Sequence, residues 1–196
     1  MKTVVKLTII GAAVAAMLFS CAHNRAYLNE EADFGFYTKV GVLPFSNLSA
    51  DKNASEKVTS SFVSELLMLN LAQVANMGDL QTVMKNVIEK IPANLSEELT
   101  AEDVQKIGLE AGVQGLFVGA VKEFGMVRSG QDQFPLVSVM VRFVDCQMGT
   151  VVWSYEVTRR GGPKFPIFSF GETHTLGEMT AKVCRDLARS YRKATE

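Results

Sequence analysis

The spacing of apolar residues along the chain predicts one domain in which strands and helices share a core. Apolar runs rich in β-branched residues predict strands over residues 39–43, 72–75 and 115–121. Between these runs, apolar residues recur three and four positions apart, which predicts three amphipathic helices. The first two thirds of the chain therefore alternate between the two periods.

The last third adds a hairpin and a final helix. Residues 137–143 alternate between apolar and polar, and residues 150–157 form a second β-rich run, so a hairpin is predicted with Gly149 in its turn. Helical spacing returns over residues 176–187. The order is β-α-β-α-α-β-β-β-α, which predicts an α/β (α+β) fold with a mixed sheet of about five strands and helices packed on it.

Three positions mark expected helix ends. Asn53 and Glu56 have the spacing of a capping box, as do Thr100 and Asp103. Gly112 follows the helix that Thr100 begins, where a glycine commonly ends a helix in a left-handed conformation.

The N-terminal segment has the pattern of a secretory signal. Lys2 and Lys6 precede an apolar run over residues 7–19, which is shorter than the roughly 20 residues of a membrane-spanning helix. We therefore expect residues 1–20 to be a signal peptide that is removed.

The end of that segment, Leu18-Phe19-Ser20-Cys21, resembles the lipobox of bacterial lipoproteins. The resemblance implies that Cys21 is lipidated and becomes the mature N-terminus. Ala22 stands where an aspartate would signal inner-membrane retention, so the expected location is the outer membrane, facing the periplasm. The alternative is an ordinary signal peptide followed by a chance cysteine. Residues 21–37 are polar without a clear period and predict a tether, with the domain over residues 38–196.

Composition excludes several classes of function. A formal net charge of −1 offers no bulk attraction to nucleic acid. The three cysteines and two histidines lack zinc-ligand spacing, so no metal is expected. The sequence has neither a P-loop nor a GxGxxG motif, and no cofactor is expected.

Three segments, at residues 39–49, 111–121 and 141–153, together resemble the periplasmic domain shared by CsgG-type lipoproteins and LpoB-type activators of penicillin-binding proteins. The resemblance lies in an opening strand with a Pro-Phe-x-Asn loop, a strand after a small-residue helix end, and a Val-Asp-x-x-x-Gly-x-x-x-Trp hairpin. CsgG-type channels insert long hairpins after the second segment and after the tryptophan strand. The corresponding residues here, 124–134 and 159–171, are too few, which argues against a pore.

Two groups of residues are candidates for binding a partner. An aromatic loop holds Phe165, Ile167, Phe168 and Phe170, which either dock a protein partner or cover an open end of the core. The final helix carries Lys182, Arg185, Arg189 and Arg192 on one face. These cations either contact an anionic lipid or acidic partner, or form a solvated face.

For each of the other candidate residues, a purely structural role is an alternative to a functional one. Cys146 and Cys184 either form a disulfide or are small buried groups. His23 lies in the expected tether, and His174 is expected to cap a helix rather than act as a catalyst. The loop over residues 44–47 either binds a ligand at a strand end or is a capped turn on which Phe45 packs.

These observations predict a non-enzymatic, lipid-anchored adaptor or assembly factor of the cell envelope. The resemblance implies an envelope protein as partner, in secretion or surface-fibre assembly or in regulation of peptidoglycan synthesis. A ring-forming, homo-oligomeric subunit of a CsgG-type secretion complex is the alternative. An enzyme acting on envelope polymers is the rival from another class, and Glu123, Asp132 and Glu156 are its candidate carboxylates. Glu123 and Glu156 are expected to face solvent instead.

Overall fold

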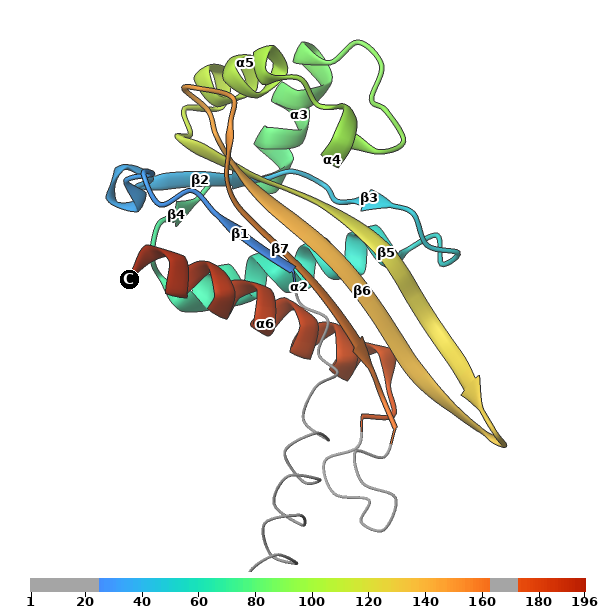
Figure 1. Ribbon diagram of the computed structural model, residues 1–196. Helices are drawn as coiled ribbons and strands as arrows, with labels where there is room; N and C mark the ends of the chain where they lie inside the picture. Colours follow the sequence, from blue (N-terminus) through green and yellow to red (C-terminus); the bar gives the residue numbers. More distant parts are fainter. Residues whose placement is uncertain (1–24, 163–172) are drawn as a thin grey trace, which may run out of the picture.

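A computed structural model describes residues 25–162 and 173–196, and within them the chain forms a seven-stranded mixed sheet (Figure 1). The strands are β1 (Arg25–Leu28), β2 (Lys39–Val42), β3 (Ser46–Asn47), β4 (Gln73–Val74), β5 (Gly115–Ser129), β6 (Asp132–Asp145) and β7 (Val151–Arg160). Their order is β1-β7-β6-β5-β2-β4, and β3 pairs with β5 beyond β2. The strands β5, β6, β7 and β1 are antiparallel, whereas β2, β3 and β4 pair in parallel.

Helices cover both faces of this sheet. The described helices are α2 (Ala54–Leu69), α3 (Met77–Val87), α4 (Leu95–Glu98), α5 (Ala101–Ala111), α6 (Leu176–Thr195) and a 3-10 turn, η1 (Phe34–Phe36). Helices α2 and α6 lie side by side on one face, and α3, α4 and α5 gather at one end of the other (Figure 1). The mixed sheet with helices packed on it is confirmed, and β1 and β3 explain why it has more than five strands.

Alternation along β5 produces the two cores. Phe117 and Val121 face α2 and α6, while Leu116 and Val118 face the other group of helices. The larger core is built around aromatic rings. The ring of Phe117 lies 4.6 Å from that of Phe143 and 4.8 Å from that of Tyr191, measured between centroids. Such contacts add to the burial of apolar area and fix how α6 crosses the sheet.

The helix ends agree only in part with the expected caps. Thr100 and Asp103 form the predicted capping box, and Gly112 ends α5 with a φ of 61°. The capping box predicted at Asn53 is wrong, because its side chain makes no capping hydrogen bond. The backbone N–H of Asn53 instead donates to the Asp51 carboxylate, 2.8 Å away.

Part of the expected tether belongs to the sheet. Residues 25–28 pair with β7, with Arg25 opposite Glu156 and Leu28 opposite Trp153. Tyr37 is buried, and its hydroxyl donates to the carboxylate of Asp145 at 2.8 Å. The polar composition of this segment concealed the strand, because an edge strand gains its hydrogen bonds from the backbone and leaves its side chains exposed.

The strands β5 and β6 continue well past the predicted ends. They form a long hairpin that projects beyond the helices and turns at Gly130, which has a φ of 66° (Figure 1). The residues between the second and third resemblance segments are therefore paired strand, with a bulge after Val121. Among the helices of the described ranges, none has the length and apolarity to cross a membrane.

Candidate functional site

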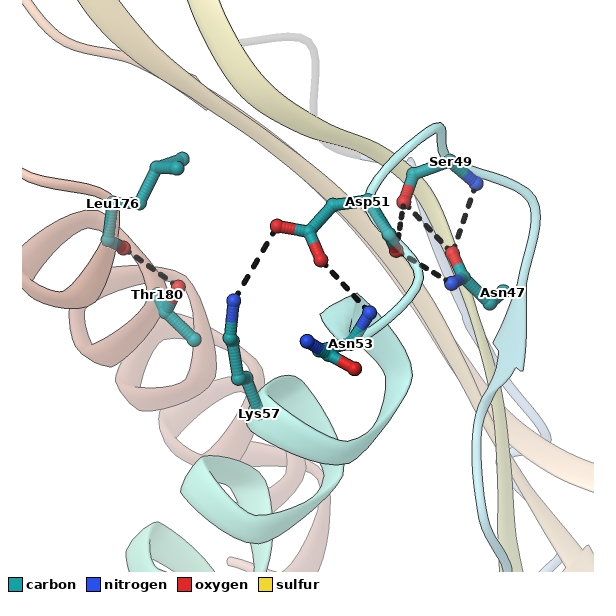
Figure 2. Close-up of polar contacts among 7 residues, drawn as sticks. All are labelled: Asn47, Ser49, Asp51, Asn53, Lys57, Leu176 and Thr180. Atoms are coloured by element: carbon teal, nitrogen blue, oxygen red, sulfur yellow. Dashed lines mark hydrogen bonds and ion pairs between the residues drawn. The ribbon is translucent and has the colours of Figure 1, made fainter.

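The expected loop at residues 44–47 leads into β3 (Ser46–Asn47), and the Asn47 side chain closes the turn that follows (Figure 2). The Asn47 side-chain oxygen accepts from the backbone N–H and the hydroxyl of Ser49, and its amide donates to the backbone oxygen of Asp51 at 2.7 Å. Lys57 then pairs with the Asp51 carboxylate at 3.3 Å. Phe45 is buried against Phe62. Both ends of the Asn47 amide are used within the loop, so the turn interpretation holds and the loop is structural.

The cations predicted on the last helix line a cavity of about 480 Å³ between α6 and the end of β7. Lys182, Arg185 and Arg189 come from α6, and Arg159 and Arg160 come from the last two positions of β7. Thr173, Met179 and Asp186 are the other described residues that line it. The structure therefore brings the three predicted cations together and adds two arginines to them. Arg192 does not line the cavity and pairs with Glu196 at 3.6 Å.

Three of the five cations are held by carboxylates. Arg159 pairs with Asp186 through Nε and a terminal nitrogen, both at 2.9 Å. Lys182 pairs with Glu178 at 2.9 Å and donates to the Thr173 hydroxyl. Arg185 contacts Glu65 of α2 at 3.5 Å. Within the described residues, no ion pair is formed by Arg160 or Arg189, and both are exposed.

A second feature is a group of exposed apolar side chains from η1, α5 and the β6–β7 turn, which border the same hollows. We call it the apolar end and define it by Phe36, Leu109 and Met148, which are 46%, 85% and 67% exposed. Two adjoining hollows of about 590 and 220 Å³ share Phe36. Large apolar side chains gathered in this way mark interaction surfaces more often than isolated ones do.

The larger hollow at the apolar end is neutral. The described residues that line it carry no charge, and Gln105, Gln114 and Gln147 supply its polar groups. Burial and the nearby charge of Asp145 raise the pKa of the Cys146 thiol to about 12, so this lining residue stays protonated. The Gln105 amide donates to the backbone oxygen of Gln147 at 3.1 Å, which fixes the turn against α5.

Two predicted sites lie outside the described residues. They are Cys21 and the aromatic loop with Phe165, Ile167, Phe168 and Phe170, so neither the anchor nor the choice between docking and core cover is tested. His23 lies outside as well. In the described part, Cys146 and Cys184 are free and buried, which agrees with the plainer interpretation.

The three carboxylates considered for an enzyme, Glu123, Asp132 and Glu156, differ in their surroundings. Glu156 is half-buried and pairs with Lys122 at 2.8 Å, so it does not simply face solvent as expected. Glu123 and Asp132 are exposed. The described residues hold no group of three or more potential metal ligands. His174 does not cap α6, because the Thr175 side chain accepts the hydrogen bond from the Glu178 N–H.

Sequence reasoning missed Arg159, Arg160 and the apolar end. Leu109 carried a readable signal, since it lies off the buried stripe that Val104 and Ile107 form on α5. The two arginines carried none, because only the pairing of β7 and the packing of α6 place them beside the helix cations.

The described residues define an α+β fold with helices on both faces of one mixed sheet. No protein-family model matches the chain, and no curated protein sequence matches it. Among solved structures it is similar to the PelC dodecamer from Paraburkholderia phytofirmans, with a TM-score of 0.57 and 18% identity over 85% of this chain and 94% of that one. It is also similar to lipoprotein GNA1162 from Neisseria meningitidis, with a TM-score of 0.54 and 21% identity over 78% and 99% of the two chains.

These matches bear on the resemblance seen in the sequence. The LpoB C-terminal domain from Salmonella enterica also matches, with 13% identity over 62% of this chain and 82% of that one, but a TM-score of 0.46 adds nothing to the argument. Identities this low establish a shared fold and no more. The chain therefore shares the fold of PelC and of lipoprotein GNA1162, and nothing in the comparisons supports the CsgG part of the resemblance.

Proposed function

We propose that this protein is a lipid-anchored component of the outer membrane, facing the periplasm, that binds a partner protein through its apolar end and performs no catalysis. The observation that carries the proposal is the group of exposed apolar side chains around a neutral hollow. Desolvating such side chains in a pocket supplies most of the binding energy of many protein interfaces.

The placement of β1 supports an orientation in which the apolar end faces away from the membrane. Cys21 precedes Arg25, the first residue of β1, by four positions, and an extended chain of four steps reaches at most about 14 Å. A lipid on Cys21 would hold the start of β1 close to the membrane. From there β1 leads toward η1 and the apolar end (Figure 1). The apolar end would point away from the membrane, toward periplasmic partners.

The anchor is tested by a single substitution. Cys21→Ser removes the thiol that would carry the lipid, and each buried methylene of an acyl chain contributes about 0.8 kcal/mol to anchoring. We expect the variant to move from the membrane fraction to the fraction released by osmotic shock, with metabolic labelling by a radioactive fatty acid lost. Unchanged membrane attachment of Cys21→Ser would show that the lipobox interpretation is wrong.

Partner binding is tested by site-specific photo-crosslinking in cells. A photoreactive residue at Met148 should give a discrete adduct, whereas the same residue at Met68, equally exposed on α2, should give none. Leu109→Ser should weaken the Met148 adduct about tenfold through lost apolar contact. Because Leu109 is 85% exposed, this change should leave the free energy of unfolding within about 0.5 kcal/mol of wild type. Equal adducts at both methionines would contradict the proposal.

A ring-forming subunit is the second candidate, and the likeness to a PelC structure that is a dodecamer favours it. In that case the Met148 adduct would contain two copies of this chain rather than a different protein. If the adduct holds another protein, its identity separates secretion or surface-fibre assembly from regulation of peptidoglycan synthesis.

A further inference from the structure

The cavity between α6 and β7 concentrates positive charge on a chain whose net charge is −1. Among the described residues that line this hollow are five of the chain's twenty lysines and arginines and one carboxylate, that of Asp186. When Glu65 and Glu178 are added from outside the lining, the cations still exceed the carboxylates by two within the part of the chain that the structure describes. Like charges held this close repel one another, so an anion in the cavity would be stabilised.

The cations divide into a supporting set and an open set. Arg159, Lys182 and Arg185 each have a carboxylate partner. The Arg159 pair joins β7 to α6 and the Arg185 pair joins α6 to α2, whereas the Lys182 pair lies within α6. Arg160 and Arg189 have no such partner among the described residues and remain exposed. Two arginine guanidinium groups approaching from different elements suit the oxygens of a phosphate, since each presents a planar fork of N–H donors.

The position of the cavity indicates where such a phosphate would come from. Arg25, the first residue of β1, lies opposite Glu156. Because the two strands are antiparallel, β7 continues past the start of β1 to Arg159 and Arg160. If Cys21 carries a lipid, as proposed above, this end of the domain lies within reach of the headgroup layer. Each lysine or arginine close to an anionic membrane surface adds its own share to the attraction between protein and membrane.

We propose that the cavity formed by Arg159, Arg160, Lys182, Arg185 and Arg189 binds the phosphate of an anionic membrane lipid. The lipid on Cys21 would then hold the protein at the membrane, and this second contact would set the angle at which the domain stands. The supporting ion pairs keep α6 in place, while Arg160 and Arg189 meet the phosphate.

The test uses the full chain with Cys21→Ser, so that binding does not depend on the covalent lipid. The probes are vesicles of phosphatidylethanolamine alone and vesicles in which about 30% is phosphatidylglycerol, at fixed ionic strength. Arg160→Gln with Arg189→Gln should bind the anionic vesicles about thirtyfold more weakly than the parent. Lys85→Gln with Lys193→Gln removes the same charge from exposed sites outside the cavity and should bind within about threefold of the parent.

Each other outcome overturns the proposal. Equal losses in both double variants would mean general charge attraction without a site. Equal binding to both kinds of vesicle would exclude an anionic lipid. Calorimetry with inorganic phosphate covers a remaining case. If the Arg160→Gln and Arg189→Gln double variant alone loses phosphate binding, and the parent does not prefer anionic vesicles, the cavity binds a soluble anion instead. Because wild-type attachment is measured separately through Cys21→Ser, failure here is distinguishable from failure of the anchor.

Discussion

Phe117→Ala is expected to lower the free energy of unfolding by about 3–5 kcal/mol. The Phe117 side chain is fully buried on β5, and its ring lies within 6.4 Å, centroid to centroid, of four other aromatic rings. Truncation removes the buried area and leaves a cavity between α2, α6 and the sheet that these rigid rings cannot close. Urea unfolding followed by circular dichroism measures the loss.

Phe36→Ala is the matched control for this prediction. It deletes the same ring from a half-exposed position on η1, and we expect a loss below about 1 kcal/mol. Its effect should appear in the crosslinking at Met148 instead. A cost for Phe117→Ala no larger than that for Phe36→Ala would show that the aromatic cluster does not organise the core.

Asp145→Ala is expected to cost about 2–4 kcal/mol of unfolding free energy. The buried carboxylate accepts from the Tyr37 hydroxyl at 2.8 Å and from the backbone N–H groups of Gln147 and Met148 at 2.8 and 2.6 Å. Alanine leaves these donors without their partner. The measurement belongs at pH 7, where the Tyr37 phenol keeps its proton even at the ordinary tyrosine pKa, which burial and Asp145 raise further.

Asp145→Asn separates the hydrogen bonds from the charge. An amide keeps an oxygen for the two backbone donors and a polar group for Tyr37, so we expect less than half of the alanine cost. Because these bonds shape the β6–β7 turn, Asp145→Ala should also weaken the Met148 adduct, and Asp145→Asn should preserve it. Equal costs for both variants would mean that the negative charge, rather than the hydrogen bonds, stabilises the turn.

Local chemistry explains which parts of the fold were predictable. The capping box of Thr100 and Asp103 and the left-handed Gly112 involve residues close in sequence, so their pattern determines their structure. Asn53 has the same spacing with Glu56, but Asp51 takes over the nearby backbone donor. A pattern of residue types cannot choose between two neighbouring acceptors, because their distances depend on the path of the loop.

The candidate surfaces also divide into a part that the sequence pattern predicts and a part that depends on tertiary packing. The face with Lys182, Arg185 and Arg189 follows from helical periodicity, which repeats along one element. The cavity also needs Arg159 and Arg160, which lie more than twenty residues earlier and reach α6 only through strand pairing. Likewise, Phe36, Leu109 and Met148 come from three separate elements, and only the packed domain makes them neighbours.

The amino-acid sequence by itself determined the alternation of strands and helices, the core-facing stripes and the signal-like N-terminus, because each depends on periodicity or composition within a short window. The tertiary structure alone decided that residues 25–28 join the sheet, that the cations enclose a cavity and that an apolar surface remains at one end. Those features depend on contacts between distant segments, whose free energy is gained only when strand register and helix packing are set together.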